Sequence, residues 1–431
     1  MRFKGIAPAV CLLGTAMILA ACGGGGSGGS SSDAAKQGAN ARGPITFVTG
    51  KDNSGIMPYI AEQWNKAHPN EKVTIKQQSD AADQQLSDLE QHFQAKDPGY
   101  DVVTVDVVWT AEFAAKGWII PLTGQYAMDT SQLLPATVKA ASYNGKLYAA
   151  PYASDGALLY YRTDLVKSAP TTWDQLISAC QGKSTSGTIT GPKPGCYAGQ
   201  FAKYEGLTCN VGEVINAAGG QFVGPDGLTP AVNTPQAASG LNFLVNGFKQ
   251  GYIPKEALGF KETESLNAFS AGQLVFMRNW PYAVAILNDK GSKVKGKFGI
   301  APLPGPQGHG ASTLGGHSLG ISAYSKYKAT GLDFLKFIES EQIQRNDLTQ
   351  GTLAPVLTSL YSDPELVKKF SYLPDLLKSI QTAVPRPITP YYPGVTEAIQ
   401  TNAYAALQGT TSTQQALSSM NAAIKSATAG G

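Results

Sequence analysis

One short stretch of the chain carries a motif typical of a catalytic nucleophile. Residues 316–320 read Gly-His-Ser-Leu-Gly and match G-x-S-x-G, which in esterases and lipases places a serine on a sharp turn. That fold requires a base histidine after the serine, but the last of the four histidines is His317, which precedes Ser318. We therefore interpret the motif as a glycine-rich turn that enters a strand.

Metal-dependent or cofactor-dependent chemistry has no better support in the sequence. The histidines form neither an H-E-x-x-H motif nor a pair four residues apart, and the cysteines form no C-x-x-C motif. We expect no metal site and no cofactor. A pair of carboxylates for glycoside hydrolysis stays open, because a chain with 31 Asp and Glu residues contains many possible pairs.

Three other residues are candidates for a ligand site. Asp106 lies near the carboxyl end of an apolar, strand-like run, where open α/β sheets bind ligands. Trp280 ends a second such run, and Arg386 stands between two prolines that stiffen the backbone, close to Tyr392. A carboxylate, a guanidinium and an indole together suit a polyhydroxylated ligand, whose hydroxyls form charge-assisted hydrogen bonds while a C–H face stacks on the ring. Each residue also has an ordinary structural explanation, as an aspartate bonded to backbone N–H groups, a core tryptophan or a surface arginine.

The elements that would position these residues alternate between strand and helix from residue 44 onward. Strands at 45–49, 73–75 and 101–109, separated by helices that end before His68 and at 94, predict a parallel sheet with helices on both faces. A second α/β unit is expected from residue 158, with a helix capped by Thr171 or Thr172. Its other elements are predicted as strands at 158–162, 274–279, 297–301 and 318–323 and a C-terminal helix at 413–427.

The N-terminus predicts export and a lipid anchor. Arg2 and Lys4 precede an apolar run over 6–19, and Leu-Ala-Ala-Cys follows at 19–22. The pattern is that of a secretory signal, and it resembles the bacterial lipobox, which implies removal of residues 1–21 and acylation of Cys22. Residues 22–43 are rich in Gly and Ser and predict a flexible tether. We expect an extracytoplasmic protein held at the cell membrane by lipid.

The remaining cysteines and the charge agree with this location. Once Cys11 leaves with the signal and Cys22 is acylated, three cysteines remain, and we favour a disulfide between Cys180 and Cys196, with Cys209 as a buried thiol. The formal charge is +3, and 42% of the residues are hydrophobic against 15% charged. These values favour large packed cores and argue against nucleic-acid binding. We expect a monomer.

Several segments taken together resemble a known family. Residues 106–114, 146–151 and 158–165, with the Thr-Thr-Trp at 171–173, resemble extracellular solute-binding proteins of the sugar-binding family 1, which serve ABC importers. Trehalose-binding lipoproteins share the motifs at 109–113, 360–364 and 386–392 in particular. The resemblance covers residues 44–427.

The resemblance implies a two-lobed α/β fold of the type II periplasmic-binding-protein class, similar to maltose-binding protein, with hinge crossovers near 152–157, 311–314 and 348–354. It places 44–153 and 313–350 in lobe 1, and 154–312 and 351–431 in lobe 2. Gly156 and the Pro/Gly-rich stretch 302–310 would absorb a hinge rotation.

The resemblance also implies a ligand site in the cleft between the lobes. It assigns Asp106 to a carboxylate that holds sugar hydroxyls, Trp280 to a stacking ring and Arg386 to a cleft arginine beside Tyr392. The other positions that it assigns are Asp52, Asn53, Glu262, Gly315 and Gly316. One position departs from the trehalose binders, which carry an asparagine where this chain has Asp155, so an acceptor replaces a group that also donates.

The function implied is capture of a disaccharide, such as trehalose, maltose or a related α-glucoside, by closure of the lobes and its delivery to the permease subunits of an ABC importer. On this interpretation the protein is not an enzyme. The alternative is a secreted lipoprotein hydrolase, either an esterase or a glycosidase.

Overall fold

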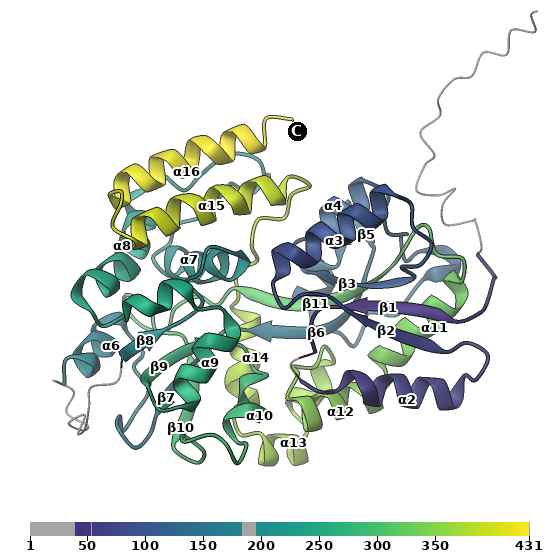
Figure 1. Cartoon of the computed structure of the whole chain (residues 1–431), viewed down its shortest axis with the longest axis horizontal. Coiled ribbons are helices and arrows are strands. Elements are labelled where there is room, and N and C mark those ends of the chain that lie inside the picture. The colour runs from purple at the N-terminus through teal and green to yellow at the C-terminus, as the bar shows by residue number, and fades with distance from the viewer. Residues whose placement is uncertain (1–38, 53, 183–194, 431) are drawn as a thin grey trace, which may run out of the picture.

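The computed structural model describes residues 39–52, 54–182 and 195–430 (Figure 1). The predicted signal peptide, the predicted acylation site Cys22, most of the predicted tether and Asn53 lie outside the described residues. Among the described residues, no helix has the length and apolar character needed to cross a membrane.

The first half of the molecule is built on a five-stranded sheet with the order β2-β1-β3-β11-β6. Its strands are β1 (Ile45–Thr49), β2 (Val73–Gln77), β3 (Val102–Asp106), β6 (Ala150–Gly156) and β11 (Leu314–Ile321). β1, β2 and β3 are parallel, as predicted, but β11 runs antiparallel to both β3 and β6. The sheet is therefore mixed, because a strand from late in the chain enters it from the opposite direction.

The helices of this half carry one buried and one exposed face. Ile60 and Trp64 of α2 are buried, as their spacing predicts, and the helix ends at Ala67, just before His68-Pro69. The helices here are α2 (Met57–Ala67), α3 (Ala82–Gln94), α4 (Thr110–Ala115), α5 (Pro135–Ala140), α11 (Lys328–Glu339) and α12 (Glu341–Gly351). A hairpin of β4 (Ser142–Tyr143) and β5 (Lys146–Leu147) lies beside them.

The second half is built on a four-stranded sheet with the order β10-β7-β9-β8. Its strands are β7 (Leu158–Arg162), β8 (Gly195–Ala198), β9 (Leu274–Asn279) and β10 (Phe298–Pro302). β7 pairs antiparallel with β9 and β10, whereas β8 is parallel to β9. The helices of this part are α6 (Trp173–Cys180), α7 (Glu205–Ala217), α8 (Pro235–Gln250), α9 (Glu262–Ser270), α10 (Ala283–Leu287), α13 (Pro364–Lys369), α14 (Leu373–Gln381), α15 (Tyr392–Leu407) and α16 (Thr413–Ala427).

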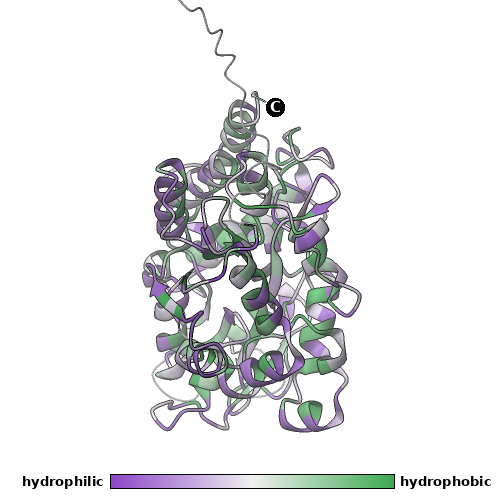
Figure 2. Cartoon of the chain, turned by 90° about the vertical axis from the view of Figure 1, so that its right-hand side faces the viewer, coloured by the Kyte–Doolittle hydropathy of each residue, from purple (hydrophilic) through white to green (hydrophobic). Residues whose placement is uncertain are grey.

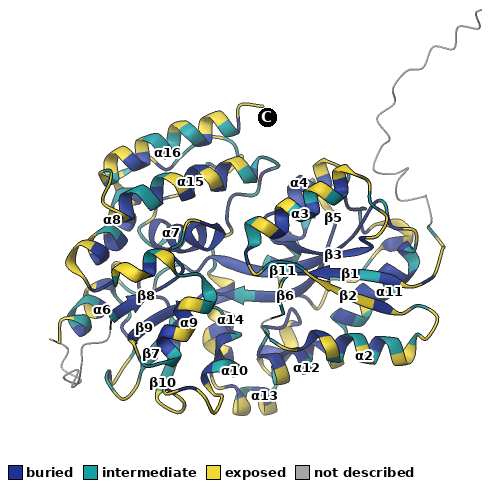
Figure 3. Ribbon diagram, viewed as in Figure 1, coloured by how far each residue is buried: buried dark blue, intermediate teal, exposed yellow. Residues whose placement is uncertain are grey.

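The two sheets form the buried interior, and the helices that cover them have exposed outer faces. Most strand residues of both sheets are buried, while the outer faces of α2, α8 and α16 are exposed (Figure 3). Many helices combine hydrophilic and hydrophobic residues, as expected for elements with one face on a core (Figure 2). The predicted cap is confirmed for α6, whose Gln175 backbone N–H donates to Thr172 Oγ1 at 3.2 Å.

Three chain segments lie side by side between the two sheets. β6 ends at Gly156 and β7 begins at Leu158, so the chain passes directly from one sheet to the other. Leu314 of β11 is paired with Gly156, and the Ser154 N–H donates to the Ala354 carbonyl at 2.9 Å, just after α12. These segments coincide with the three expected crossovers, and the exact lobe boundaries remain a prediction.

Two predicted elements are corrected. The strand expected over 101–109 ends at Asp106, because the Asp106 carbonyl and carboxylate accept from the N–H groups of Trp109 and Val108 and turn the chain into α4. The G-x-S-x-G segment is not a turn, since all of it lies within β11, which begins at Leu314 rather than 318. Ser318 is buried at 2% exposure in the middle of that strand.

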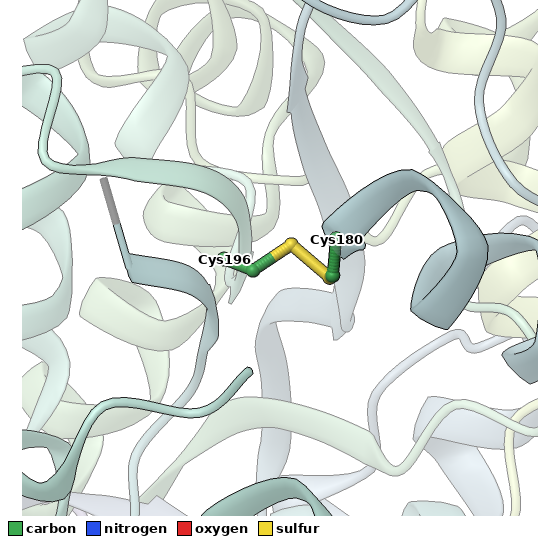
Figure 4. Close-up of a disulfide and its surroundings, with 2 residues drawn as sticks. All are labelled: Cys180 and Cys196. Atoms are coloured by element: carbon green, nitrogen blue, oxygen red, sulfur yellow. A yellow bond between two sulfur atoms is a disulfide. The ribbon is translucent and has the colours of Figure 1, made fainter. Parts of the chain in front are cut away.

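A disulfide joins Cys180, at the end of α6, to Cys196 on β8 (Figure 4). The Cα atoms are 5.4 Å apart, and the two cysteines are separated by 16 positions in sequence. Cys209 is a free thiol buried in α7, and burial raises its pKa to about 12. It is therefore neutral at physiological pH.

Replacing Cys180 with serine should lower the free energy of unfolding by about 3 kcal/mol, because the unfolded chain gains the entropy of an open loop of this length. Urea unfolding of both proteins measures the difference. Reductant should destabilise the wild-type chain by the same amount and leave Cys180→Ser unchanged. Equal unfolding curves for oxidised and reduced wild-type protein would contradict the prediction.

Candidate functional site

Residues from both halves of the molecule line one cavity of about 220 Å³. Eight of the ten predicted ligand residues lie on its walls: Asp52, Asp106, Asp155, Glu262, Trp280, Gly315, Gly316 and Arg386. Tyr392 does not line it, and Asn53 lies outside the described residues. The cavity lies between the five-stranded sheet, which supplies Asp106, and the helices α7 and α9 of the second half.

Arg386 links the two halves across this cavity. Its Nη2 donates to Asp106 Oδ1 on β3 at 2.5 Å, and its Nη1 donates to Glu205 Oε1 at the start of α7 at 2.5 Å. Arg386, Asp106 and Glu205 are each 5–7% exposed, counted over the whole residue. Among the described residues, no donor contacts Asp106 Oδ2, so that oxygen is available to a ligand hydroxyl.

Tyr392 has a different position from the one predicted. It is fully buried at the start of α15, and its hydroxyl donates to Glu205 Oε1 rather than pointing into the cavity. Because a buried phenol needs a hydrogen-bond partner, the carboxylate of Glu205 fixes the ring in the core. The structure thus places Tyr392 against Glu205 and outside the residues that line the cavity, and its direct contact with a ligand stays a prediction.

Asp52 lies at the cavity, but its oxygens already have partners. Oδ1 accepts from the N–H groups of Ser54 and Gly55 at 3.0 and 2.8 Å, and Oδ2 accepts from the Met57 N–H at 2.9 Å. This carboxylate therefore holds the chain at the first turn of α2. Its negative charge there also interacts favourably with the positive end of the helix dipole.

Trp280 follows β9 directly, and its indole contacts a buried cation. The guanidinium of Arg278 lies 3.8 Å from the centroid of the indole, and Arg278 is itself fully buried against Glu213 and Gln200. Such a cation–π contact fixes the ring in place without filling the cavity.

The two predicted glycines have a clear structural role in β11. A Cβ at Gly315 would lie 2.7 Å from Cζ3 of Trp280, so only glycine leaves room for the indole. Gly316 has φ of 101°, and a Cβ there would lie 2.3 Å from the Ala153 carbonyl oxygen. Gly315 is therefore required by the indole, and Gly316 by its backbone conformation and by the close approach of Ala153.

Glu262 lies at the other side of the cavity, at the first turn of α9. Tyr204 donates its hydroxyl to Glu262 Oε2 at 2.6 Å. No described residue donates to Oε1 of Glu262, so this acid, like Asp106, keeps one oxygen available.

Asp155 differs from the other acids predicted for the site, because its carboxyl has no hydrogen-bond donor among the described residues. It lies on β6, lines the cavity, and accepts no hydrogen bond from any described residue. Burial raises its pKa to about 7, although the charge of Arg278 opposes the shift. A carboxyl of this kind is half protonated near neutral pH and is costly to ionise without a donor.

Asp155→Asn should therefore stabilise the ligand-free protein more at pH 8 than at pH 5. A raised folded-state pKa means that stability is lost as pH rises from the unfolded value of about 4 through 7, and asparagine does not ionise. The melting temperature at the two pH values measures the effect, with a gain of a few degrees expected at pH 8.

The control for this test is Asp226→Asn. Hydrogen bonds from Thr229 and neighbouring backbone groups lower the pKa of Asp226 to about 2, so this variant should gain no stability at pH 8. An equal effect of pH on wild-type protein and Asp155→Asn would contradict the assignment of the shift to Asp155.

Glu205 was not among the residues predicted for the site. The sequence of α7 does contain one signal, because the helix has two acids and no Lys or Arg. In the structure, Glu205 to Ile215 are all buried. Buried acids require cationic partners from elsewhere in the chain. In the structure, Arg386 meets Glu205 and Arg278 meets Glu213. The described residues contain no group of three or more His, Cys, Asp or Glu placed to hold a metal ion.

Comparison with known proteins identifies the family. The protein-family model described as "Bacterial extracellular solute-binding protein" matches residues 49–345. The chain belongs to this family. The family comprises transport proteins rather than enzymes, and its extracellular character agrees with an extracytoplasmic location.

Curated relatives of this solute-binding protein include a "Probable ABC transporter-binding protein" from Deinococcus radiodurans, 34% identical over 366 residues, covering 80% of this chain and 84% of the relative. A "Mannitol-binding protein" from Pseudomonas aeruginosa is 28% identical over 251 residues, or 56% of each chain.

Solved structures confirm the two-lobed fold similar to maltose-binding protein. Maltose-bound MalE3 from T. maritima superposes with a TM-score of 0.83 at 30% identity, covering 89% of this chain and 99% of MalE3. The GacH receptor of Streptomyces glaucescens has a TM-score of 0.78 at 24% identity, covering 90% of this chain and 98% of the receptor. This second likeness supports the fold alone.

Proposed function

We propose that this solute-binding protein captures a disaccharide of the trehalose, maltose or related α-glucoside type and delivers it to the permease subunits of an ABC importer. Cys22 would carry the lipid that holds the protein at the membrane, and the tether would keep it close to the permease. The protein acts as a monomer in this account.

One observation carries the proposal. Asp106, Trp280 and Arg386, which are far apart in sequence, line the same cavity and come from both halves of the molecule. Carboxylate oxygens without protein donors suit sugar hydroxyls, and the indole suits a C–H face. A dissociation constant near 1 μM requires about −8 kcal/mol, which a few such contacts supply after ordering costs.

The relatives support a sugar or polyol as ligand. MalE3, at 30% identity, is maltose-bound, and the curated relative from P. aeruginosa is named for mannitol. Asp155 stands where trehalose binders carry an asparagine, so an α-glucoside other than trehalose belongs in any screen.

A ligand that contacts both halves would favour the closed arrangement of the lobes, because its contacts to Asp106 and to Trp280 form together only there. The esterase alternative is disfavoured by the position of Ser318, which is buried inside β11.

Thermal-shift screening of the purified chain against trehalose, maltose, sucrose and mannitol, followed by calorimetry of each hit, tests the function. We expect one disaccharide to bind in the micromolar range and to be recovered intact after incubation. Release of glucose from the sugar would favour the hydrolase, and the absence of any thermal shift would contradict the proposal.

A further inference from the structure

The guanidinium of Arg386 is oriented by two carboxylates. Nη2 contacts Asp106 on one side of the cavity and Nη1 contacts Glu205 on the other, while Nε has no acceptor among the described residues. The direction of the guanidinium plane is therefore determined at its two Nη atoms. If one carboxylate is removed, a single contact to the other remains.

The Glu205 carboxylate has no free oxygen for a ligand, although it reaches the cavity wall. Oε1 accepts from Arg386 and from the Tyr392 hydroxyl, and Oε2 accepts from Thr396 Oγ1 at 2.7 Å. Thr396 is in turn bonded to Thr208 at 2.7 Å. All three of these donors come from other parts of the chain, so the carboxylate is held by α15 and by the segment that precedes it.

The surroundings make this carboxylate expensive to keep ionised. Glu205 is 5% exposed, and burial raises its pKa to about 7 against the opposing charge of Arg386. The other ionisable groups that face it are Asp106, Tyr392, Cys209 and Asp83, which accepts from the Glu205 backbone N–H. A buried acid whose oxygens both have donors, and whose single cationic partner is Arg386, is explained if its task is to hold that partner.

We propose that Glu205 is a positioning residue of the sugar site: it fixes Arg386 so that the guanidinium holds Asp106 by Oδ1 and leaves Oδ2 facing the ligand. The effect on affinity rests on the proposed function. The effect on the orientation of Arg386 does not.

Three variants of the full chain test this inference. Glu205→Ala removes both acceptors. Glu205→Gln keeps an oxygen for Arg386 and Tyr392 and presents its amide to Thr396, so it should rescue the geometry. Glu397→Gln, on α15, removes a largely exposed acid that pairs with Lys203 and serves as the control.

Two measurements are made on each protein. The first is the crystal structure without sugar, and the second is the calorimetric affinity for the disaccharide that binds the wild-type chain. Trehalose and maltose are the first probes. In Glu205→Ala we expect the Arg386 guanidinium to turn about its remaining contact and cover Asp106 Oδ2, and the affinity to fall about tenfold or more. Glu205→Gln should stay within about threefold of wild type. Glu397→Gln should match wild type in both measurements.

Distinct outcomes separate the explanations. A purely structural role would lower the melting temperature of both Glu205 variants and leave the affinity of the folded protein unchanged, and this result would overturn the inference. An affinity loss with the Arg386 guanidinium still in its wild-type orientation on Asp106 Oδ1 would also overturn it, because Glu205 would then act on the ligand itself.

Two further cases are covered by the same design. If the wild-type chain binds none of the sugars, the proposed function fails, and the crystal structures still decide whether Glu205 orients Arg386. If Glu205→Ala does not fold, Glu205→Asp, which withdraws the carboxylate by one methylene, replaces it with the same expected direction in both measurements.

Discussion

Replacing Trp280 with alanine should weaken binding of the captured disaccharide by about tenfold or more and leave the chain folded. The indole lies in the cavity wall, partly exposed, and its loss removes the apolar surface against which a sugar ring would stack. A tenfold change corresponds to about 1.4 kcal/mol, less than the burial of one aromatic side chain provides. Calorimetry gives the affinity, and thermal unfolding verifies the fold.

Trp280→Tyr is the matched control for that experiment. Tyrosine keeps an aromatic face above Arg278 and should retain affinity to within about threefold of the wild-type value. Unchanged affinity in Trp280→Ala would remove the indole from the site, and equal losses in the two variants would show that stacking is not its contribution.

Replacing Arg386 with alanine should have the largest effect on stability. It leaves Asp106 and Glu205 buried without their shared cation, and breaking a buried pair in this way costs about 3–5 kcal/mol. The loss should be greatest at pH 8 and shrink toward pH 5, because the pKa of Glu205 is already raised to about 7 and would rise further without Arg386. Urea unfolding at the two pH values measures both effects.

Two variants accompany Arg386→Ala. Adding Glu205→Gln to it should recover part of the lost stability, since the double variant has one buried charge fewer. Arg345→Ala, which breaks a more exposed pair with Glu341 and Asp363, should cost less than about 1 kcal/mol. Equal losses for Arg386→Ala and Arg345→Ala would contradict the account of the buried network.

Local patterns predicted most of the elements. The spacing of Ile60 and Trp64 gave α2, and the strands predicted at 45–49 and 274–279 have the bounds of β1 and β9. The antiparallel entry of β11 and its start at Leu314 were not predicted. The direction of β11 depends on pairing with β3, which lies about 200 positions earlier in the chain, and no local periodicity contains that information.

Those site residues were predictable whose type and position in the sequence already indicate ligand binding. A carboxylate at a strand end, an arginine between prolines and a strand-terminal tryptophan were recognisable, and they share one cavity. The partners of buried acids were not recognisable, because they depend on tertiary packing. Tyr392 was therefore assigned to the ligand, and Glu205, which binds both Tyr392 and Arg386, was missed.

The crystal structure of the chain with the disaccharide that binds most tightly is the most direct test of the central claim. The account predicts one sugar in the cavity between the two sheets, with a ring against Trp280 and a hydroxyl bonded to Asp106 Oδ2. A sugar bound elsewhere on the surface, with that cavity containing only water, would contradict it.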